Sequence, residues 1–174
     1  MKKIFSLILI MLLAIGGAYA LSYSAFITLS SGASFTKVSD EEMLRTSYQL
    51  TLEAEPAGIR FGNSSISIPL TLTYFSKSLI YDYYMLNSHL DFGIGLAYRY
   101  AFSPLFTLKT EGLVSYRYYQ EIDASTAAFT ISPAFEFYPA DYTAIVLPAD
   151  FTFTKDEFSL SLGIGCLVHF GGER

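Results

Sequence analysis

The stretch "SHLDFGIGLAYRY" (residues 88–100) alternates between two kinds of side chain along its whole length. One set of alternate positions is large and apolar: Leu90, Phe92, Ile94, Leu96, Tyr98 and Tyr100. The positions between them are small or polar: His89, Asp91, Gly93, Gly95, Ala97 and Arg99. Because successive side chains of a β-strand point to opposite faces of the sheet, this period of two predicts a strand with one apolar and one polar face.

The same alternation recurs along most of the chain and predicts an all-β protein. We expect strands at residues 23–36, 46–55, 64–76, 88–100, 105–119, 126–138, 143–154 and 158–170. A tilted strand needs about 9–11 residues to cross a bilayer, whereas strands of globular proteins average about 5–6, so these are long enough to span. Prolines in "EPAG", "FSPL" and "YPAD" predict short connections at Pro56, Pro104 and Pro139, and the connections between these are longer and more charged. The pattern indicates an eight-stranded, antiparallel, up-and-down transmembrane β-barrel.

The composition indicates which face points outward. Charged residues make up 16% of the chain, against about 25% in typical soluble domains. The apolar strand face carries no charged residue, as expected of a face in lipid, where a Lys or Arg at mid-bilayer costs roughly 2–4 kcal/mol. Tyrosines and phenylalanines gather at the strand ends, which suits the two membrane interfaces. The alternative is a soluble, secreted, lipocalin-like ligand-binding barrel with the apolar face inside, but such large side chains would overfill an eight-stranded interior.

The N-terminal "MKKIFSLILIMLLAIGGAYA" has the pattern of a secretory signal peptide: a basic start, a short apolar run and a small-x-small cleavage site. We therefore expect a signal peptide at residues 1–20 and a single barrel domain at residues 21–174. Removing Lys2 and Lys3 takes the formal net charge from −5 to −7. This acidic balance disfavours nucleic-acid binding. The single cysteine, Cys166, excludes an internal disulfide.

This pattern resembles the small eight-stranded outer-membrane barrels of diderm bacteria, the group that contains OmpA-type transmembrane domains, OmpX and OmpW. The last strand, "FSLSLGIGCLVHF", also resembles the assembly signal of that group, since it alternates and ends in the aromatic Phe170. The resemblance implies an outer-membrane location, recognition by the barrel-assembly machinery and a monomer in outer-membrane lipid. Two departures are the "GGER" that follows Phe170 and the lack of a peptidoglycan-binding domain, so the anchoring role of OmpA does not carry over.

The polar face predicts a charge cluster inside the barrel. Unpaired charges in a narrow interior are costly, so they are expected to pair. We hypothesise a salt-bridge plug in the lumen, formed by Glu53, Arg99, Lys109, Glu111 and Glu136. The alternative is that these charges are scattered and solvated by lumenal water.

Four inward glycines fall at mid-height on strands that face each other across a closed eight-stranded barrel. They are Gly93, Gly95, Gly163 and Gly165. Their missing side chains either open a narrow aqueous path or leave lumen space for long neighbours such as Lys109 and Arg117. We favour the second, because eight-stranded interiors are normally filled.

Three prolines lie inside expected strands: Pro69, Pro133 and Pro148. A proline cannot donate a hydrogen bond to a neighbouring strand, so we expect a bulge or an interrupted ladder near the last two.

Side chains with reactive chemistry do not combine into a recognisable site. Ser88 and His89 point to opposite faces of one strand, which excludes a nucleophile–base pair, and Cys166 and His169 are separated in the same way. We expect no catalytic residues, no metal site and no cofactor, and therefore no enzymatic activity. The sequence favours a structural or surface-interaction role in the cell envelope, with any surface partner left open. The alternative is a narrow passive channel for small or apolar solutes, as the resemblance to OmpW implies.

Overall fold

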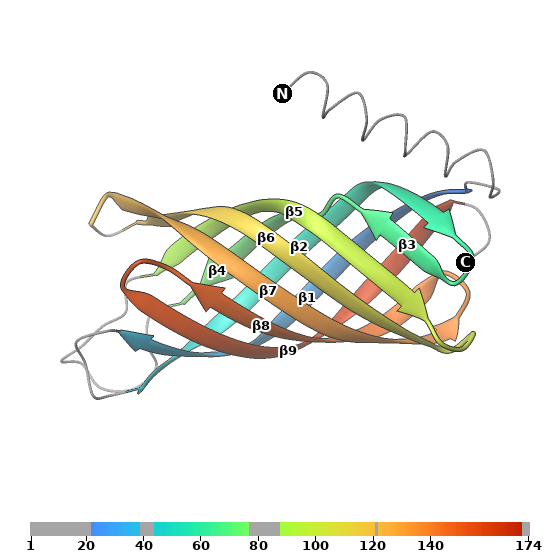
Figure 1. Cartoon of the computed structure of the whole chain (residues 1–174). Coiled ribbons are helices and arrows are strands. Elements are labelled where there is room, and N and C mark those ends of the chain that lie inside the picture. Colours follow the sequence, from blue (N-terminus) through green and yellow to red (C-terminus); the bar gives the residue numbers. More distant parts are fainter. Residues whose placement is uncertain (1–21, 39–43, 77–87, 121, 172–174) are drawn as a thin grey trace, which may run out of the picture.

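The computed structural model describes residues 22–38, 44–76, 88–120 and 122–171 (Figure 1). The expected signal peptide lies outside the described residues. The described strands are β1 (Ser22–Val38), β2 (Leu44–Phe61), β3 (Ser64–Ser67), β4 (Leu70–Phe75), β5 (His89–Ala101), β6 (Phe106–Tyr119), β7 (Ala124–Ala140), β8 (Thr143–Phe153) and β9 (Glu157–Gly171). Nowhere in these ranges is there a helix long and apolar enough to cross a membrane.

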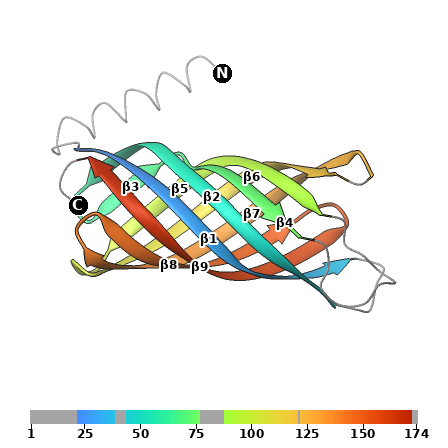
Figure 2. The ribbon, with the colours of Figure 1, turned by 180° about the vertical axis from the view of Figure 1, so that it is seen from behind.

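The strands form one closed ring. Every pair of neighbours is antiparallel, and β1 pairs with both β2 and β9, which closes the barrel. Since β3 and β4 both lie between β2 and β5, the nine described strands fill eight positions in the ring. Figures 1 and 2 show the barrel from two opposite sides, with its strands tilted relative to its long axis. The predicted eight-stranded, antiparallel, up-and-down barrel is confirmed.

The two ends of the barrel differ in their connections. The end where β1 starts and β9 ends, here called the terminal end, also carries the turns at Gly62–Asn63, 102–105 and 141–142. The opposite end, here called the loop end, carries the turns at Ile122–Asp123 and 154–156. The height of any lumenal residue follows from its position along its strand relative to these two ends.

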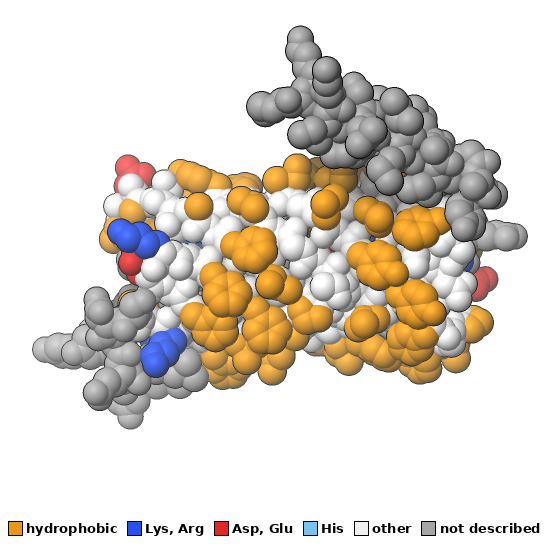
Figure 3. All heavy atoms as spheres, viewed as in Figure 1, with side chains coloured by type: hydrophobic (Ala, Val, Ile, Leu, Met, Phe, Trp, Pro, Cys, Tyr) orange, Lys and Arg blue, Asp and Glu red, His pale blue; other side chains and the backbone are white. Residues whose placement is uncertain are grey.

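The apolar strand face points outward, as predicted. Ile94, Leu96 and Val114 are 55%, 63% and 61% exposed at mid-strand, and hydrophobic side chains cover the flank of the barrel in Figure 3. The alternate polar positions, such as Ser34, Ser132 and Thr152, are buried in the lumen. Soluble monomers rarely expose apolar patches above a few hundred Å², whereas this surface matches a lipid environment. The lipocalin-like arrangement, with the apolar face inside, is therefore excluded.

One expected connection is wrong. The "EPAG" stretch at Pro56 is not a turn: β2 runs through it to Phe61, and the chain turns at Gly62 and Asn63 instead. Gly62 has φ of 59°, which favours glycine at this position. Pro56 is accommodated because β2 carries an extra residue there: Glu55 pairs with Phe26, and Gly58 with Ser24. A bulge tolerates a residue that cannot donate a ladder hydrogen bond.

The prolines inside strands interrupt pairing where expected. Ile68 and Pro69 separate β3 from β4. Along β7 and β8, Ile131 pairs with Phe151 and the next pair is Ala134 with Pro148, so Pro133 has no partner in this ladder. Pairing of β8 with β9 likewise skips Leu147 and Pro148, although the register is the same on both sides of each gap. The register shift itself lies nearer the turn, between Phe137 and Ala140.

An arginine on the outward face tests the lipid-facing assignment. We expect Ile94→Arg, at the middle of β5, to lower the free energy of unfolding in phospholipid vesicles by about 2–4 kcal/mol, because it places a charge at mid-bilayer. The control is Ile122→Arg: Ile122 is 59% exposed in the turn at the loop end, where the cost near an interface is about 0–1 kcal/mol. Urea titration of the vesicle-folded protein measures both, and equal losses would contradict the assignment.

Candidate functional site

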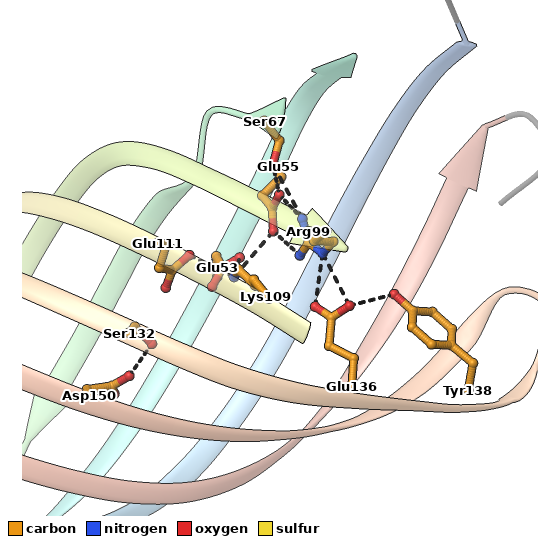
Figure 4. A network of polar contacts seen from close by, with 10 residues as sticks. All are labelled: Glu53, Glu55, Ser67, Arg99, Lys109, Glu111, Ser132, Glu136, Tyr138 and Asp150. Atoms are coloured by element: carbon orange, nitrogen blue, oxygen red, sulfur yellow. Dashed lines mark hydrogen bonds and ion pairs between the residues drawn. The ribbon is translucent and has the colours of Figure 1, made fainter. Parts of the chain in front are cut away.

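A buried guanidinium links three strands across the terminal half of the lumen. Arg99 on β5 donates from Nε to Glu136 on β7 at 2.9 Å, and its other two nitrogens bind the carboxylate of Glu55 on β2. Both carboxylates are fully buried, and Arg99 is 4% exposed. The guanidinium also lies 4.1 Å from the ring centre of Phe26 on β1. The contacts of Arg99 with Glu55 and Glu136, drawn in Figure 4, tie β5 to β2 and β7, neither of which pairs with β5 in the sheet.

A lysine extends this network toward the loop end. The Nζ atom of Lys109 on β6 ion-pairs with Glu53, lies 2.7 Å from Glu111, and lies 3.4 Å from Glu55. At the other side of the network, the Tyr138 hydroxyl donates to Glu136 at 2.9 Å, and Ser67 donates to Glu55. We call Glu53, Glu55, Arg99, Lys109, Glu111 and Glu136 the ionic plug.

The structure brings together all five residues of the hypothesised charge cluster: Glu53, Arg99, Lys109, Glu111 and Glu136. Sequence reasoning left out Glu55 and Tyr138. The alternation does place Glu55 on the lumenal face with Glu53, two residues away, but the hypothesised plug did not include it. Tyr138 is one of the strand-end aromatic residues that the sequence assigns to a membrane interface, yet it is 2% exposed and faces the lumen.

The ionic plug divides the lumen. One cavity of about 40 Å³ lies on its loop side and is lined in part by Glu53, Lys109 and Glu111. A second, also about 40 Å³, lies at the terminal end beside Arg99 and Tyr138. A water molecule needs roughly 10–15 Å³ of such space, so each cavity holds a few waters at most. Glu55 and Glu136 are fully buried, and neither of them lines either cavity.

A second ionic contact lies toward the loop end. Arg117 on β6 donates to both carboxylate oxygens of Asp91 on β5, at 2.8 and 2.9 Å, and to Glu157 on β9 at 2.9 Å. The Tyr119 hydroxyl donates to the same Glu157 carboxylate at 3.1 Å. Arg117 also lies over the ring of Phe75, at 5.3 Å from its centre. The lumen is thus crossed by ion pairs at two heights.

The four inward glycines do not have the surroundings that sequence reasoning expected. A Cβ atom at Gly95 would collide with the carbonyl oxygen of Gly112. A Cβ atom at Gly163 would lie 2.9 Å from a carbonyl oxygen of β1, and one at Gly165 would lie 2.6 Å from another. At Gly93 it would meet the hydroxyl of Thr71. Three of the four positions therefore permit close approach of a neighbouring backbone. The long side chains expected to fill this space, Lys109 and Arg117, are held by carboxylates instead.

The remaining residues singled out in the sequence lie apart from one another. Asp91 is held by Arg117, whereas His89 stacks on Phe75 with ring centres 4.3 Å apart, so these residues do not form a catalytic triad. Cys166 is exposed on the outside of β9, whereas His169 is buried against Phe26. Phe170 is 50% exposed and points outward at the end of β9. No three His, Cys, Asp or Glu side chains within the described ranges are arranged to hold a metal ion.

Comparison with known proteins places this fold among small transmembrane barrels. Neisserial surface protein A has a TM-score of 0.56 at 11% identity, over 84% of this chain and 97% of that one. The attachment invasion locus protein Ail of Yersinia pestis has a TM-score of 0.55 at 10% identity, over 85% and 99%. Its structure in a phospholipid bilayer nanodisc gives 0.52 at 10% identity, over 86% and 99%. At these identities the similarity concerns the fold.

No protein-family model matches the chain, and no curated protein sequence matches it.

Arg99→Ala tests the ionic plug. Removing the guanidinium leaves Glu55 and Glu136 buried without their main partner, and breaking a buried pair typically costs about 3–5 kcal/mol. We expect the thermal unfolding temperature of the refolded protein to fall by several degrees. The control is Arg60→Ala, which removes an arginine at the same end of the barrel whose Nε donates to an exposed carbonyl. Melting curves that coincide with wild type for Arg99→Ala would refute the plug.

A pair of glycine variants tests the close approach of β5 and β6. Gly95→Ala is expected to destabilise the barrel by about 1–3 kcal/mol, because its methyl group collides with backbone that cannot move aside. Gly112→Ala, on the neighbouring strand, meets nothing within 4 Å and should leave stability unchanged. Urea unfolding of both variants gives the comparison. Equal stability would mean that Gly95 serves another purpose.

Proposed function

We propose that this chain is an integral outer-membrane protein with a structural or surface-interaction role in the cell envelope, and that it has no enzymatic activity. The observation that carries the proposal is a continuous outward apolar face around an interior closed by the ionic plug. The outward face provides the membrane anchor. The closed interior leaves the two ends of the barrel as the parts available for contacts.

The membrane location rests on the outer surface. Apolar side chains cover the outer surface around the middle of the barrel. Exposed aromatic side chains lie near its ends: Tyr98, Tyr100 and Tyr142 toward the terminal end, and Tyr116 and Phe158 toward the loop end. Such belts lie at the two interfaces of a transmembrane barrel. The fold is shared with Ail, described as an outer membrane protein. Export by the expected signal peptide, and recognition of the strand ending in Phe170 by the barrel-assembly machinery, complete the proposal.

A surface role is supported by two features. The proteins with a similar fold include a Neisserial surface protein and an attachment invasion locus protein. In addition, the hairpins near residues 120–123 and 154–156 stand at the end of the barrel opposite the termini, which faces outward from the cell if the termini are periplasmic. Non-enzymatic function is supported by Asp91, whose carboxylate is occupied by Arg117.

The alternative role, a narrow passive channel for small or apolar solutes, requires a path through the ionic plug. Glu55 and Glu136 are fully buried around Arg99, and the space on either side holds only a few waters. Ion passage would require the Arg99 pairs to separate. We therefore favour the non-conducting role.

Two measurements test the proposal. The protein expressed in a diderm bacterium should fractionate with the outer membrane and should migrate differently on a gel before and after heating, since folded barrels resist detergent. Purified protein in planar bilayers should give no discrete conductance steps. Steps in wild-type protein would establish the channel instead, and failure to fractionate with the outer membrane would overturn the membrane assignment.

A further inference from the structure

The ionic plug contains more carboxyl groups than cations. Four glutamates face one arginine and one lysine, so full ionisation would leave a formal excess of two negative charges. All six side chains are buried. An unbalanced charge is costly away from water, and a buried carboxyl group commonly avoids this cost by keeping its proton. At least one glutamate of the ionic plug is therefore expected to be protonated in the folded barrel.

Two of the four carboxylates have contacts that favour the ionised form. Glu55 receives two nitrogens of Arg99 and the hydroxyl of Ser67. Glu136 receives the Nε atom of Arg99 at 2.9 Å and the hydroxyl of Tyr138 at 2.9 Å. Hydrogen bonds donated to a carboxylate stabilise its charge. We assign the negative charge to these two groups.

Glu53 has much weaker compensation. Among the ion pairs of the described residues it takes part in one, with the Nζ atom of Lys109. That ammonium is shared, since it lies 2.7 Å from Glu111 and 3.4 Å from Glu55. Three carboxyl groups around one ammonium cannot all be balanced by it.

The position of Glu53 relative to Glu55 supplies a second, independent reason. The two residues lie on the same face of β2, and their carboxyl groups are within hydrogen-bonding distance of each other. Two ionised carboxylates are both acceptors and repel each other, so they form such a contact only when one of them carries a proton. Because Arg99 holds Glu55 in its ionised form, the proton belongs to Glu53.

We propose that Glu53 is a proton-binding group, which keeps its proton in the folded barrel at neutral pH and donates a hydrogen bond to the Glu55 carboxylate. Lys109 is then left to balance Glu111. The negative charge that remains is spread over Glu55 and Glu136, which share Arg99 and each accept a neutral hydroxyl donor. The proposal concerns the ionic plug alone and is independent of the envelope role.

The consequence is a barrel whose stability depends on pH. A glutamate of the unfolded chain titrates near pH 4.3, so it is ionised at neutral pH, whereas the folded state keeps the proton on Glu53. Rising pH therefore favours the unfolded state, and this contribution is lost by up to about tenfold in the folding equilibrium constant for each pH unit. The titratable and charged groups around Glu53 come from several strands: Glu55 on β2, Arg99 on β5, Lys109 and Glu111 on β6, Glu136 on β7 and Asp150 on β8. The residues paired with Glu53 on β1 and β4 are Thr28 and Thr71, which do not titrate.

The first test compares wild type with Glu53→Gln in phospholipid vesicles. Glutamine has nearly the same shape, carries no titrating group and can still donate to Glu55. Urea unfolding between pH 6 and pH 9 gives the folding equilibrium constant of each protein. We expect the ratio of wild type to Glu53→Gln to fall by up to about tenfold per pH unit, and Glu53→Gln to be at least as stable as wild type at pH 8.

Glu136→Gln is the matched control for this comparison. It makes the same change at another buried glutamate of the ionic plug, but there it removes an ionised partner of Arg99. We expect it to lower the folding equilibrium constant at pH 7 by more than tenfold, in contrast to Glu53→Gln.

Infrared spectroscopy detects the proton directly, because a protonated carboxyl group absorbs at a higher frequency than a carboxylate. Wild type at pH 7 should show this absorption, and part of it should be missing from Glu53→Gln. Glu111→Gln should retain that part, which distinguishes the two glutamates that contact Lys109. If Glu53→Gln does not fold, the unbranched Glu53→Met takes its place in both measurements.

Four results would overturn the proposal. One is wild type without protonated-carboxyl absorption at pH 7, and another is a stability ratio that stays constant from pH 6 to pH 9. A third is absorption that is lost from Glu111→Gln and kept in Glu53→Gln, which would place the proton on Glu111. The fourth is failure of both neutral replacements of Glu53 to fold, since a group that is already neutral should tolerate them.

Discussion

The structure depends on one constraint, which is that a chain in hydrocarbon must satisfy its own backbone hydrogen bonds. Pairing of β1 with β9 along nearly their whole length removes the open edges that a sheet would otherwise present to lipid. Once the ring is closed, all alternate side chains must point into lipid or into a narrow lumen. The apolar outer face and the polar, charged interior both follow from this closure.

Closure also explains why the prolines are found where they are. A closed barrel has no edge strand, so a proline, which has no backbone N–H to donate to a neighbouring strand, must lie at a bulge or at an interruption of the strand pairing. Pro56 sits at the bulge of β2, Pro69 separates β3 from β4, and Pro133 and Pro148 fall together in gaps of the ladder. Pro148 also lines the cavity on the loop side of the ionic plug, so this gap in the ladder borders open lumenal space.

The interior contains ion pairs at two heights. At the terminal end, Arg99 satisfies Glu55 and Glu136 through a geometry that occupies its whole guanidinium group. Nearer the loop end, Arg117 pairs with Asp91 and Glu157. A lumen of this kind serves stability more directly than transport, because Arg99 and Arg117 are each held by carboxylates from two other strands.

The alternation in residues 88–100 and its repeats was enough to predict the strands, their two faces and the closed barrel, because strand periodicity is a local property of the chain. It also predicted which charges face inward. The partners of Arg99 could not be read from it, since Glu136 and Glu55 lie 37 and 44 residues away and meet it only when β2, β5 and β7 curve around one lumen. Likewise, the role of Gly95 depends on how closely β6 approaches, and the end of β2 at Phe61 depends on a bulge that pairing with β1 creates.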